Sequence, residues 1–143
     1  MLTLDIIPDL VYHPIMPEAR KKSTIKPRKK HTKWVIQSLL EEVREWPADV
    51  REEMGGQLNK VEYGGEPDDF KPMKTIGMGV FEIRVTDEGN NKYRLIYVAK
   101  FEEAIYVLHV ITKKKTQKTP QSDINTAKNR FATLQEWRKK QKL

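Results

Sequence analysis

The stretch VFEIRVTDEGNNKYRLIYVAKFEEAIYVLHVI, residues 80–111, decides the fold of this 143-residue chain. Its first part alternates apolar residues with Glu82 and Arg84, which is the period of a half-buried strand. After a turn sequence rich in Asp, Gly and Asn, two apolar runs at 93–99 and 104–111 predict two further strands. Three strands joined by short turns predict an antiparallel meander.

Helical periodicity flanks this stretch on both sides. Before it, one apolar face repeats from about Lys33 to Trp46 and a second from Val50 to Val61, with acidic residues on the other faces. After it, residues 124–134 carry a third apolar face, with Thr119 as the expected N-cap and Pro120 as the first helical residue. The sequence therefore predicts an α+β domain: a small antiparallel β-sheet, two N-terminal helices as a hairpin, and a C-terminal helix packed on the sheet.

Composition and length indicate one domain, at residues 32–143. Residues 1–31 are expected to be an N-terminal extension, punctuated by prolines and basic clusters, with Leu2–Ile7 as a candidate edge strand. The chain lacks cysteine, which excludes disulfides and thiolate metal sites. No apolar run approaches the roughly 20 residues of a membrane span, and the first residues do not resemble a signal peptide. We therefore expect a cytoplasmic protein with no membrane partner.

Positive charge is concentrated in the second half of the chain. The net charge is +7, yet residues 32–70 hold ten acidic and four basic residues, whereas residues 71–143 hold sixteen basic and seven acidic ones. A cationic surface suits a polyanion such as RNA or DNA, or an acidic protein partner. The alternative is a solvated basic surface without a partner.

The predicted strand registers gather part of this charge on the sheet. A turn centred near Gly89 places Arg84 opposite Arg94, and a next turn at 101–102 places Arg94 opposite His109. Like charges opposite one another cost stability unless an anion lies between them. The row therefore predicts a concave cationic sheet suited to a phosphodiester backbone. Further lysines precede the first predicted strand or follow the third, namely Lys71, Lys74, Lys113, Lys114 and Lys115.

Each of these residues also has a purely structural interpretation. Arg84 has potential partners in Glu82 or Glu102, and Arg94 in an acid on the helical hairpin. His109 alternates with apolar residues, which is typical of a hydrogen-bonded core histidine. The chain has no HExxH, Walker or GxSxG motif, so we expect no metal and no cofactor.

Four segments together resemble the RelE/ParE toxin superfamily, and within it the HigB-like, phage-derived branch. They are KPMKTIGMGVFEIR at 71–84, YRLIY at 93–97, YVLH at 106–109 and KKKTQKTP at 113–120. The resemblance covers about residues 33–135. It implies a RelE-like fold and a type II toxin–antitoxin toxin, acting as a ribosome-dependent mRNA endoribonuclease (mRNA interferase) that inhibits translation. Its chemistry would need no metal, because the ribose 2′-OH attacks the adjacent phosphate. The implied partners are the ribosome, mRNA and a cognate antitoxin with a helix-turn-helix DNA-binding domain.

The resemblance also implies roles for single residues. Arg94 would bind the scissile phosphate, Arg84 would share its charge, and Lys113 and Lys114 would stabilise charge or help to protonate the leaving group. His109 is the best candidate acid or base, because imidazoles exchange protons near neutral pH. RNA or ribosome contacts would come from Lys71, Lys74, Tyr97, Lys115 and Lys118.

One departure from the family pattern leaves the acid and base open. RelE uses a tyrosine at the start of its last helix, and the comparable position here is about Ile124, which cannot transfer a proton. Tyr93 and Tyr97 are fallback candidates, provided that neighbouring cations lower a tyrosine pKa that is ordinarily near 10. The departure keeps an alternative in view: a ParE-like toxin that acts by binding a protein such as DNA gyrase.

Overall fold

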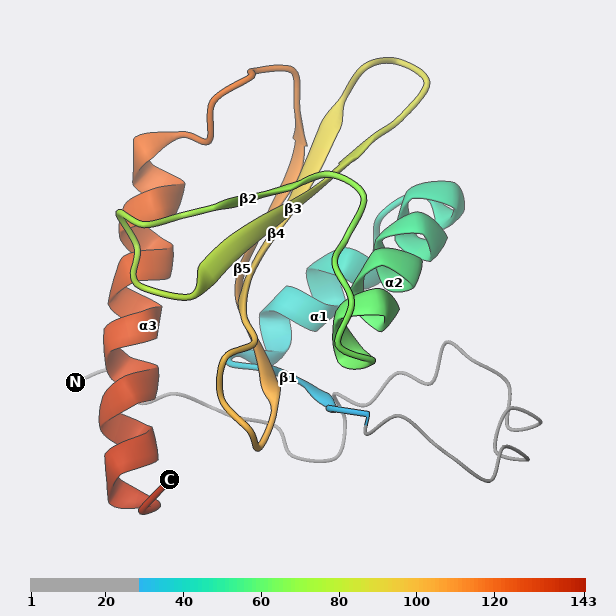
Figure 1. Cartoon of the computed structure of the whole chain (residues 1–143). Coiled ribbons are helices and arrows are strands. Elements are labelled where there is room, and N and C mark those ends of the chain that lie inside the picture. Colours follow the sequence, from blue (N-terminus) through green and yellow to red (C-terminus); the bar gives the residue numbers. More distant parts are fainter. Residues whose placement is uncertain (1–28) are drawn as a thin grey trace, which may run out of the picture.

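The three predicted strands form the centre of a five-stranded sheet (Figure 1). The structure, a computed structural model, describes residues 29–143, so the expectations for the N-terminal extension and its edge strand lie outside the described residues. The strands are β1 Thr32–Trp34, β2 Phe70–Pro72, β3 Val80–Thr86, β4 Lys92–Val98 and β5 Ile105–Lys114. The helices are α1 Gln37–Arg44, α2 Ala48–Glu62 and α3 Gln121–Lys140. The predicted α+β class is confirmed.

The sheet is mixed, and this corrects the expectation of a purely antiparallel one. Its order is β1-β5-β4-β3-β2, with β1 parallel to β5 and the other pairs antiparallel. The sequence pattern assigned β1 to the first helix, and that assignment is wrong. The pattern misled because Trp34, at the end of the strand, and Val35, directly after it, are buried as they would be in a helix. The helix begins only at Gln37, after Ile36 in an extended conformation.

The opposite edge of the sheet is a short strand that the sequence did not reveal. β2 pairs with β3 and places Lys71 opposite Glu82. Residues 73–79 then turn back into β3, with Gly79 at a φ of +82°. A Cβ atom on Gly77 would lie 2.3 Å from the ring of Phe131, so this turn packs directly against α3. Lys74 is exposed on the turn.

Of the two predicted registers, one is confirmed and one is wrong. Arg84 lies opposite Arg94 as expected. Arg94, however, pairs with Ile111, and His109 pairs with Ile96. The turn is centred on Glu102 instead of between Phe101 and Glu102, which moves the partner by one residue, and a register shift between Ile96 and Tyr97 moves it by one more. Such an irregularity adds a residue to one strand and cannot be located by counting from a turn. Since the error is an even number of residues, Arg94 and His109 still share one face.

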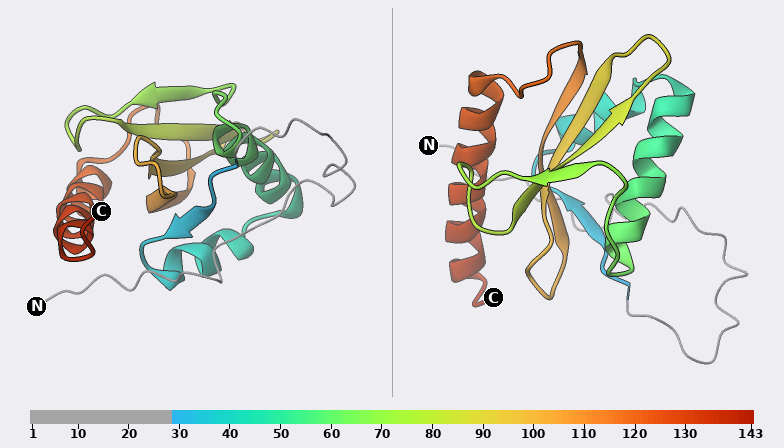
Figure 2. Two further views of the ribbon diagram at one scale, coloured as in Figure 1. Left: turned by 60° about the horizontal axis from the view of Figure 1, so that its bottom comes forward. Right: turned by 45° about the horizontal axis from the view of Figure 1, so that its top comes forward.

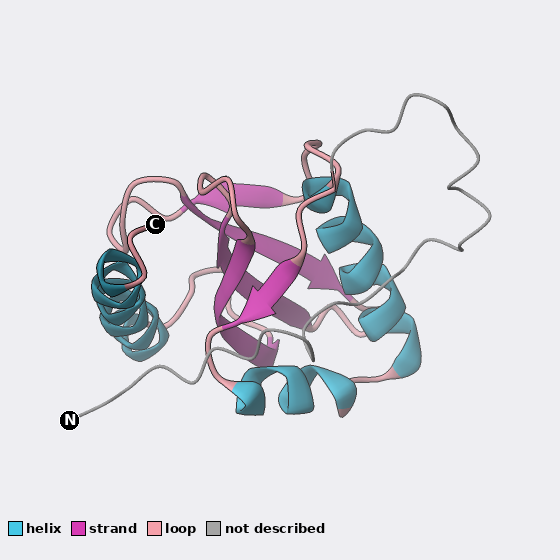
Figure 3. Cartoon of the chain, turned by 90° about the horizontal axis from the view of Figure 1, so that it is seen from below, coloured by secondary structure: helices cyan, strands magenta, loops and turns pink. Residues whose placement is uncertain are grey.

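The two faces of the sheet meet different helices. α1 and α2 cover one face and α3 covers the other, as Figures 2 and 3 show from two directions. Trp46 and Tyr93 pack together on the first face, with ring centroids 5.1 Å apart. On the second face, α3 buries the apolar residues that its periodicity predicted, Ala127, Phe131 and Leu134. The cationic row lies on this second face, beneath α3 and the segment that leads into it.

Candidate functional site

Arg94 lies in the middle of β4 and is completely buried. Its Nη2 donates a hydrogen bond to the carbonyl oxygen of Thr116, and its Nε lies 3.8 Å from Oε1 of Glu82. Burial lowers the pKa of this guanidinium, while Glu82 opposes the shift. Among the residues that the structure describes, Nε and Nη1 have no hydrogen-bond partner. Arg94 is thus a buried cation with incomplete hydrogen bonding, which is uncommon in folded proteins.

Residues 115–119, which connect β5 to α3, close over the two arginines. Beyond the Thr116–Arg94 bond, Arg84 Nη1 donates to the carbonyl oxygen of Gln117 at 3.5 Å. The hydroxyl of Thr119 donates to Oε2 of Glu82. Thr119 therefore does not cap α3, whose N-cap is Pro120, and this corrects the predicted cap. The predicted cationic sheet is not an exposed surface in this structure, because this closing segment covers Arg94 and α3 covers His109.

Arg84 is less enclosed than Arg94. Its Nη2 lies 3.8 Å from Oδ1 of Asp69, so its partner is neither Glu82 nor Glu102. The side chain borders a groove whose other lining residues include six acids: Asp49, Glu53, Asp68, Asp69, Asp87 and Glu88. Hydrogen bonds from Asn91 lower the pKa of Asp87, and those from Lys60 and Gln57 lower the pKa of Asp68. Arg84 thus meets carboxylates on one side and the closing segment on the other.

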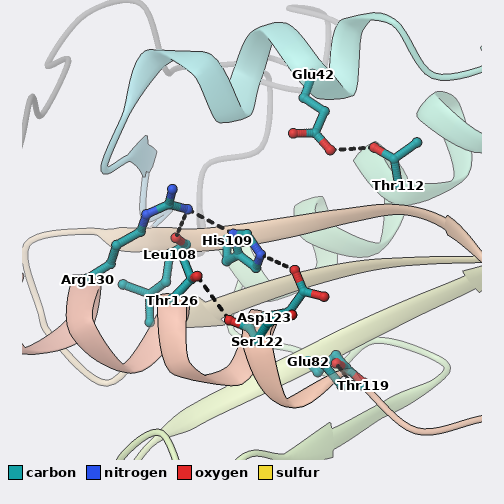
Figure 4. Close-up of polar contacts among 10 residues, drawn as sticks. All are labelled: Glu42, Glu82, Leu108, His109, Thr112, Thr119, Ser122, Asp123, Thr126 and Arg130. Carbon is teal, nitrogen blue, oxygen red and sulfur yellow. Dashed lines mark hydrogen bonds and ion pairs between the residues drawn. The ribbon is translucent and has the colours of Figure 1, made fainter.

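His109 is held between two residues of α3 that the sequence analysis did not single out (Figure 4). Its Nε2 lies 2.7 Å from Oδ1 of Asp123, and Nη1 of Arg130 lies 2.8 Å from its Nδ1. Arg130 also donates to the carbonyl oxygen of Leu108 at 3.1 Å. Because a guanidinium only donates, Nδ1 accepts and the proton of a neutral ring sits on Nε2, facing Asp123. Both ring nitrogens are therefore engaged.

A sequence signal for this cluster did exist. Asp123 and Arg130 are seven residues apart, so they share a face of α3, and that face includes Ala127 of the predicted apolar stripe. Opposite charges inside an apolar stripe indicate a buried polar partner on the element opposite. Burial lowers the pKa of Arg130, with the distant Glu42 acting against the shift.

Exposed lysines surround the closing segment. Lys113 and Lys114 end β5, and Lys115 and Lys118 follow in the connection, all exposed. Lys115 Nζ donates to the carbonyl oxygen of Gly89 at 3.3 Å, which ties the connection to the β3–β4 turn. Lys71 lies at the sheet edge opposite Glu82. The structure therefore brings four of the predicted lysines together, on and beside the segment that covers Arg94.

The tyrosines lie elsewhere. Tyr97 is buried on the opposite face of the sheet, stacked on Phe81 with ring centroids 6.1 Å apart. Burial, reinforced by Glu66, raises its pKa to about 12. Burial also raises the pKa of Tyr93. These shifts oppose the lowering that a tyrosine base would need, so neither residue meets the condition set for a fallback base. Ile124 packs against the core at the start of α3.

The described part of the chain offers no metal site and no membrane span. Residues 29–143 contain no group of three or more His, Asp or Glu side chains arranged to hold a metal ion. Among the helices of the same residues, none is long and apolar enough to cross a membrane.

Comparison with known proteins gives one match. A family model described as phage-derived protein Gp49-like (DUF891) matches residues 41–132, which span the second half of α1, all of α2, the sheet from β2 to β5 and most of α3. No curated protein and no solved structure matches the chain. Gp49-like proteins form a RelE/toxin-like family. The matched region covers well over half of the sequence, and the chain belongs to the phage-derived, Gp49-like protein family.

Proposed function

We propose that the protein is the toxin of a HigB-like type II toxin–antitoxin system and cleaves mRNA on the ribosome without a metal ion. Membership of a toxin-like family supports the general class. The observation that carries the nuclease is Arg94, a buried guanidinium beneath a lysine-rich segment, whose Nε and Nη1 lack acceptors among the described residues. A phosphate supplies charged acceptors in the geometry that a guanidinium fork matches.

The proposed reaction is an internal transfer at phosphorus. The ribose 2′-oxygen attacks the adjacent phosphorus, the bond to the 5′-oxygen breaks, and the products are a 2′,3′-cyclic phosphate and a 5′-hydroxyl. A base takes the 2′-proton and an acid gives a proton to the leaving oxygen. Arg94 and Arg84 stabilise the charge that builds up on the phosphorane oxygens. Lys113 or Lys114 stabilises or protonates the leaving group, and Lys71, Lys74, Lys115 and Lys118 hold RNA and ribosome backbone.

His109 is the proposed proton-transfer group, and its contacts define what must change for it to act. Since Nδ1 accepts from Arg130 and Nε2 faces Asp123, a ribose hydroxyl reaches a lone pair only when Arg130 leaves Nδ1. Asp123 then orients the ring and stabilises the imidazolium that forms, as a carboxylate does beside a catalytic histidine. Asp123 is a positioning residue in this scheme.

Access to the phosphate site requires the closing segment to move. Arg94 has no exposed surface, so an RNA phosphate meets it only after Thr116 and its neighbours have shifted. A toxin-like family implies an antitoxin. We propose that this partner is a helix-turn-helix DNA-binding protein that presents acidic residues to Lys113–Lys118. The complex would block the site and repress its own operon.

A second function, binding of a protein target such as DNA gyrase in the manner of ParE, is favoured by two observations. Arg94 is fully covered and has Glu82 as a counter-ion, which suits a structural role. The groove beside Arg84 is lined by carboxylates, which repel RNA and attract a basic protein surface.

A cleavage assay separates the two functions. Purified protein is incubated with an mRNA, with and without programmed ribosomes, and the 5′ ends are mapped; free RNA is tested in magnesium and in EDTA buffers. Cuts at A-site codons that need ribosomes support the proposed nuclease. Cuts on free RNA in EDTA support metal-independent cleavage but contradict its dependence on the ribosome. No cuts, with toxicity retained in cells, favour a protein target.

A further inference from the structure

Glu82 is an unusual neighbour for a phosphate-binding arginine. It is completely buried in the middle of β3, on the same face as Arg84 and Arg94. Oε2 accepts a hydrogen bond from Thr119, whereas Oε1 lies 3.8 Å from Arg94 Nε, beyond hydrogen-bond distance. Among the described residues, Oε1 has no hydrogen-bond partner, and neither does Nε of Arg84. Glu82 and Arg94 therefore lie close enough for their opposite charges to attract, but no direct hydrogen bond joins them.

The same molecule contains a fully bonded pair of the same residue types. At the other end of α3, Arg138 binds Glu103 in a bidentate arrangement, with Nε 2.6 Å from Oε2 and Nη2 3.0 Å from Oε1. That geometry is the strong form of an arginine–carboxylate contact. The Glu82–Arg94 pair is therefore not the best that this fold can make, and a better-placed anion can compete with Glu82.

We propose that Glu82 is a built-in competitor for the RNA phosphate at Arg94, and that Thr119 links its displacement to opening of residues 115–119. This inference rests on the proposed function, because the ligand is taken to be a phosphate of RNA. Three groups then change together: the phosphate replaces Glu82 beside Arg94, Thr119 loses its acceptor, and the Thr116 carbonyl releases Nη2. Phosphate affinity is set by this exchange, so the closed form described here binds anions weakly.

The carboxylate is a competitor rather than a simple structural counter-ion because of how it is held. Among the residues that the structure describes, its one hydrogen bond comes from Thr119, a residue of the connection that must move, and not from a neighbouring strand. The connection is held over the sheet by few other bonds, chiefly Thr116 to Arg94, Gln117 to Arg84 and Lys115 to Gly89. Two of these three involve the arginines that a phosphate would engage. Phosphate binding to the arginines and opening of residues 115–119 therefore break the same contacts.

The test measures how inorganic phosphate stabilises the intact chain against heat, with sodium chloride at equal ionic strength as the reference. Ligand that binds only the folded state raises the melting temperature in proportion to its affinity. Glu82→Gln removes the competing charge and keeps the shape, and we expect apparent phosphate affinity to rise at least about tenfold. Thr119→Val removes the hydroxyl that holds Glu82, should raise the affinity severalfold, and serves if Glu82→Gln does not fold.

Two controls make the result specific. Glu103→Gln removes the same charge from the bidentate pair and should leave the phosphate response at the wild-type level. Adding Arg94→Met to Thr119→Val should abolish the gain in affinity. Equal phosphate responses in wild type, Thr119→Val and Glu103→Gln would overturn the proposal, as would a gain that survives without Arg94.

The ribosome assay distinguishes failure of this proposal from failure of the proposed function. If wild type cuts no mRNA while phosphate selectively stabilises Glu82→Gln and Thr119→Val through Arg94, the nuclease is wrong and the competitor stands. If wild type cuts A-site codons but all variants respond equally to phosphate, the nuclease stands and the competitor is wrong.

Discussion

The two faces of the central sheet are built on different principles. The face beneath α1 and α2 is apolar, and residues from both helices meet Leu95 and Trp34 there. The face beneath the N-terminal half of α3 holds Glu82, Arg94 and His109, with Asp123 and Arg130 opposite them. Hydrophobic burial is non-directional and tolerates small displacements. A buried polar network is stable only when each polar atom has a hydrogen-bond partner, and within residues 29–143 several atoms of this network have none.

The comparison indicates that the apolar face contributes mainly to stability and the polar face mainly to function. The apolar face holds the sheet to its helices, whereas the polar face keeps charged groups out of water with incomplete pairing, at a cost in stability. Perturbed ionisable groups cluster at functional sites. The first two predictions below each break one face and leave the other intact, and the remaining ones compare groups outside the polar network.

The largest expected effect comes from removing one partner of the buried ion pair. Arg94→Met leaves Glu82 as an uncompensated buried charge, so the free energy of unfolding should fall by about 3–5 kcal/mol. Adding Glu82→Met should recover most of this loss, because two apolar side chains then replace the pair. Urea denaturation followed by circular dichroism measures both. A double variant as unstable as the single one would contradict the assignment of Glu82 as the counter-ion.

An apolar truncation on the opposite face should be almost as damaging to stability. Leu95 follows Arg94 directly, points to the other side of the sheet and is completely buried. Leu95→Ala should lower the free energy of unfolding by about 3 kcal/mol through the cavity it leaves. The folded fraction should still cleave at the wild-type rate when rates are corrected for folding. A loss of cleavage beyond that correction would show that the two faces are not separate.

Two carboxylates, the half-buried Glu103 and the buried Glu62, should give opposite responses to acid. Although burial opposes its charge, hydrogen bonds from Arg138 hold the pKa of Glu103 below its ordinary value of 4.5. Glu103 therefore contributes stability above pH 4.5 and loses it as pH falls through the lowered pKa. Wild type should lose stability relative to Glu103→Gln on acidification below pH 4.5, as urea denaturation across pH would show. Parallel pH profiles for the two proteins would contradict this.

Glu62, at the end of α2 on the apolar side, should behave in the reverse way. Burial raises its pKa above 4.5 despite the hydrogen bond from Thr32 and the charge of Lys29. Its ionisation in the folded state is therefore unfavourable, and stability is lost as pH rises from 4.5 through the raised pKa. Glu62→Gln should become more stable relative to wild type over that interval. The same urea titrations test this. A decrease, with rising pH, in the free energy of unfolding of Glu62→Gln relative to wild type would refute it.

The smallest effect on stability is expected for the exposed lysines. Lys114→Gln with Lys118→Gln should change the free energy of unfolding by less than about 0.5 kcal/mol. The same two substitutions should weaken RNA binding. They should also reduce the slope of log binding constant against log salt concentration by the amount expected for the loss of about two phosphate contacts. Lys139→Gln with Lys140→Gln, at the far end of α3, is the matched control and should leave RNA binding unchanged. Equal losses for both pairs would mean that net charge alone, and not the closing segment, attracts RNA.

Periodicity predicted the elements that are buried along one face only or along their whole length. The strands β3, β4 and β5 and the helices α2 and α3 were predicted because their apolar residues repeat with a clear period. β1 was missed because a three-residue strand buried beside a helix start has no period of its own. β2 was missed for the same reason, since its pairing with β3 is a tertiary contact.

For the candidate site, the sequence predicted the residue types better than their surroundings. The cross-strand pair Arg84–Arg94 and the shared face of His109 followed from strand period alone. The cover over Arg94 did not, because it depends on the path of residues 115–119, and Thr119 looked like an N-cap until its hydroxyl was placed on Glu82. Asp123 and Arg130 were missed although their spacing on one helix face was a usable signal.

The most direct test of the central claim, that the polar face of the sheet binds and cleaves RNA through Arg94, is mRNA cleavage on programmed ribosomes by the double variant Arg94→Met with Glu82→Met. This variant removes both charges and should retain the fold by circular dichroism. The account predicts A-site cuts by wild type and at least about a hundredfold slower cutting by the folded double variant. Cutting at the wild-type rate by that variant, or no cutting by wild type, would contradict it.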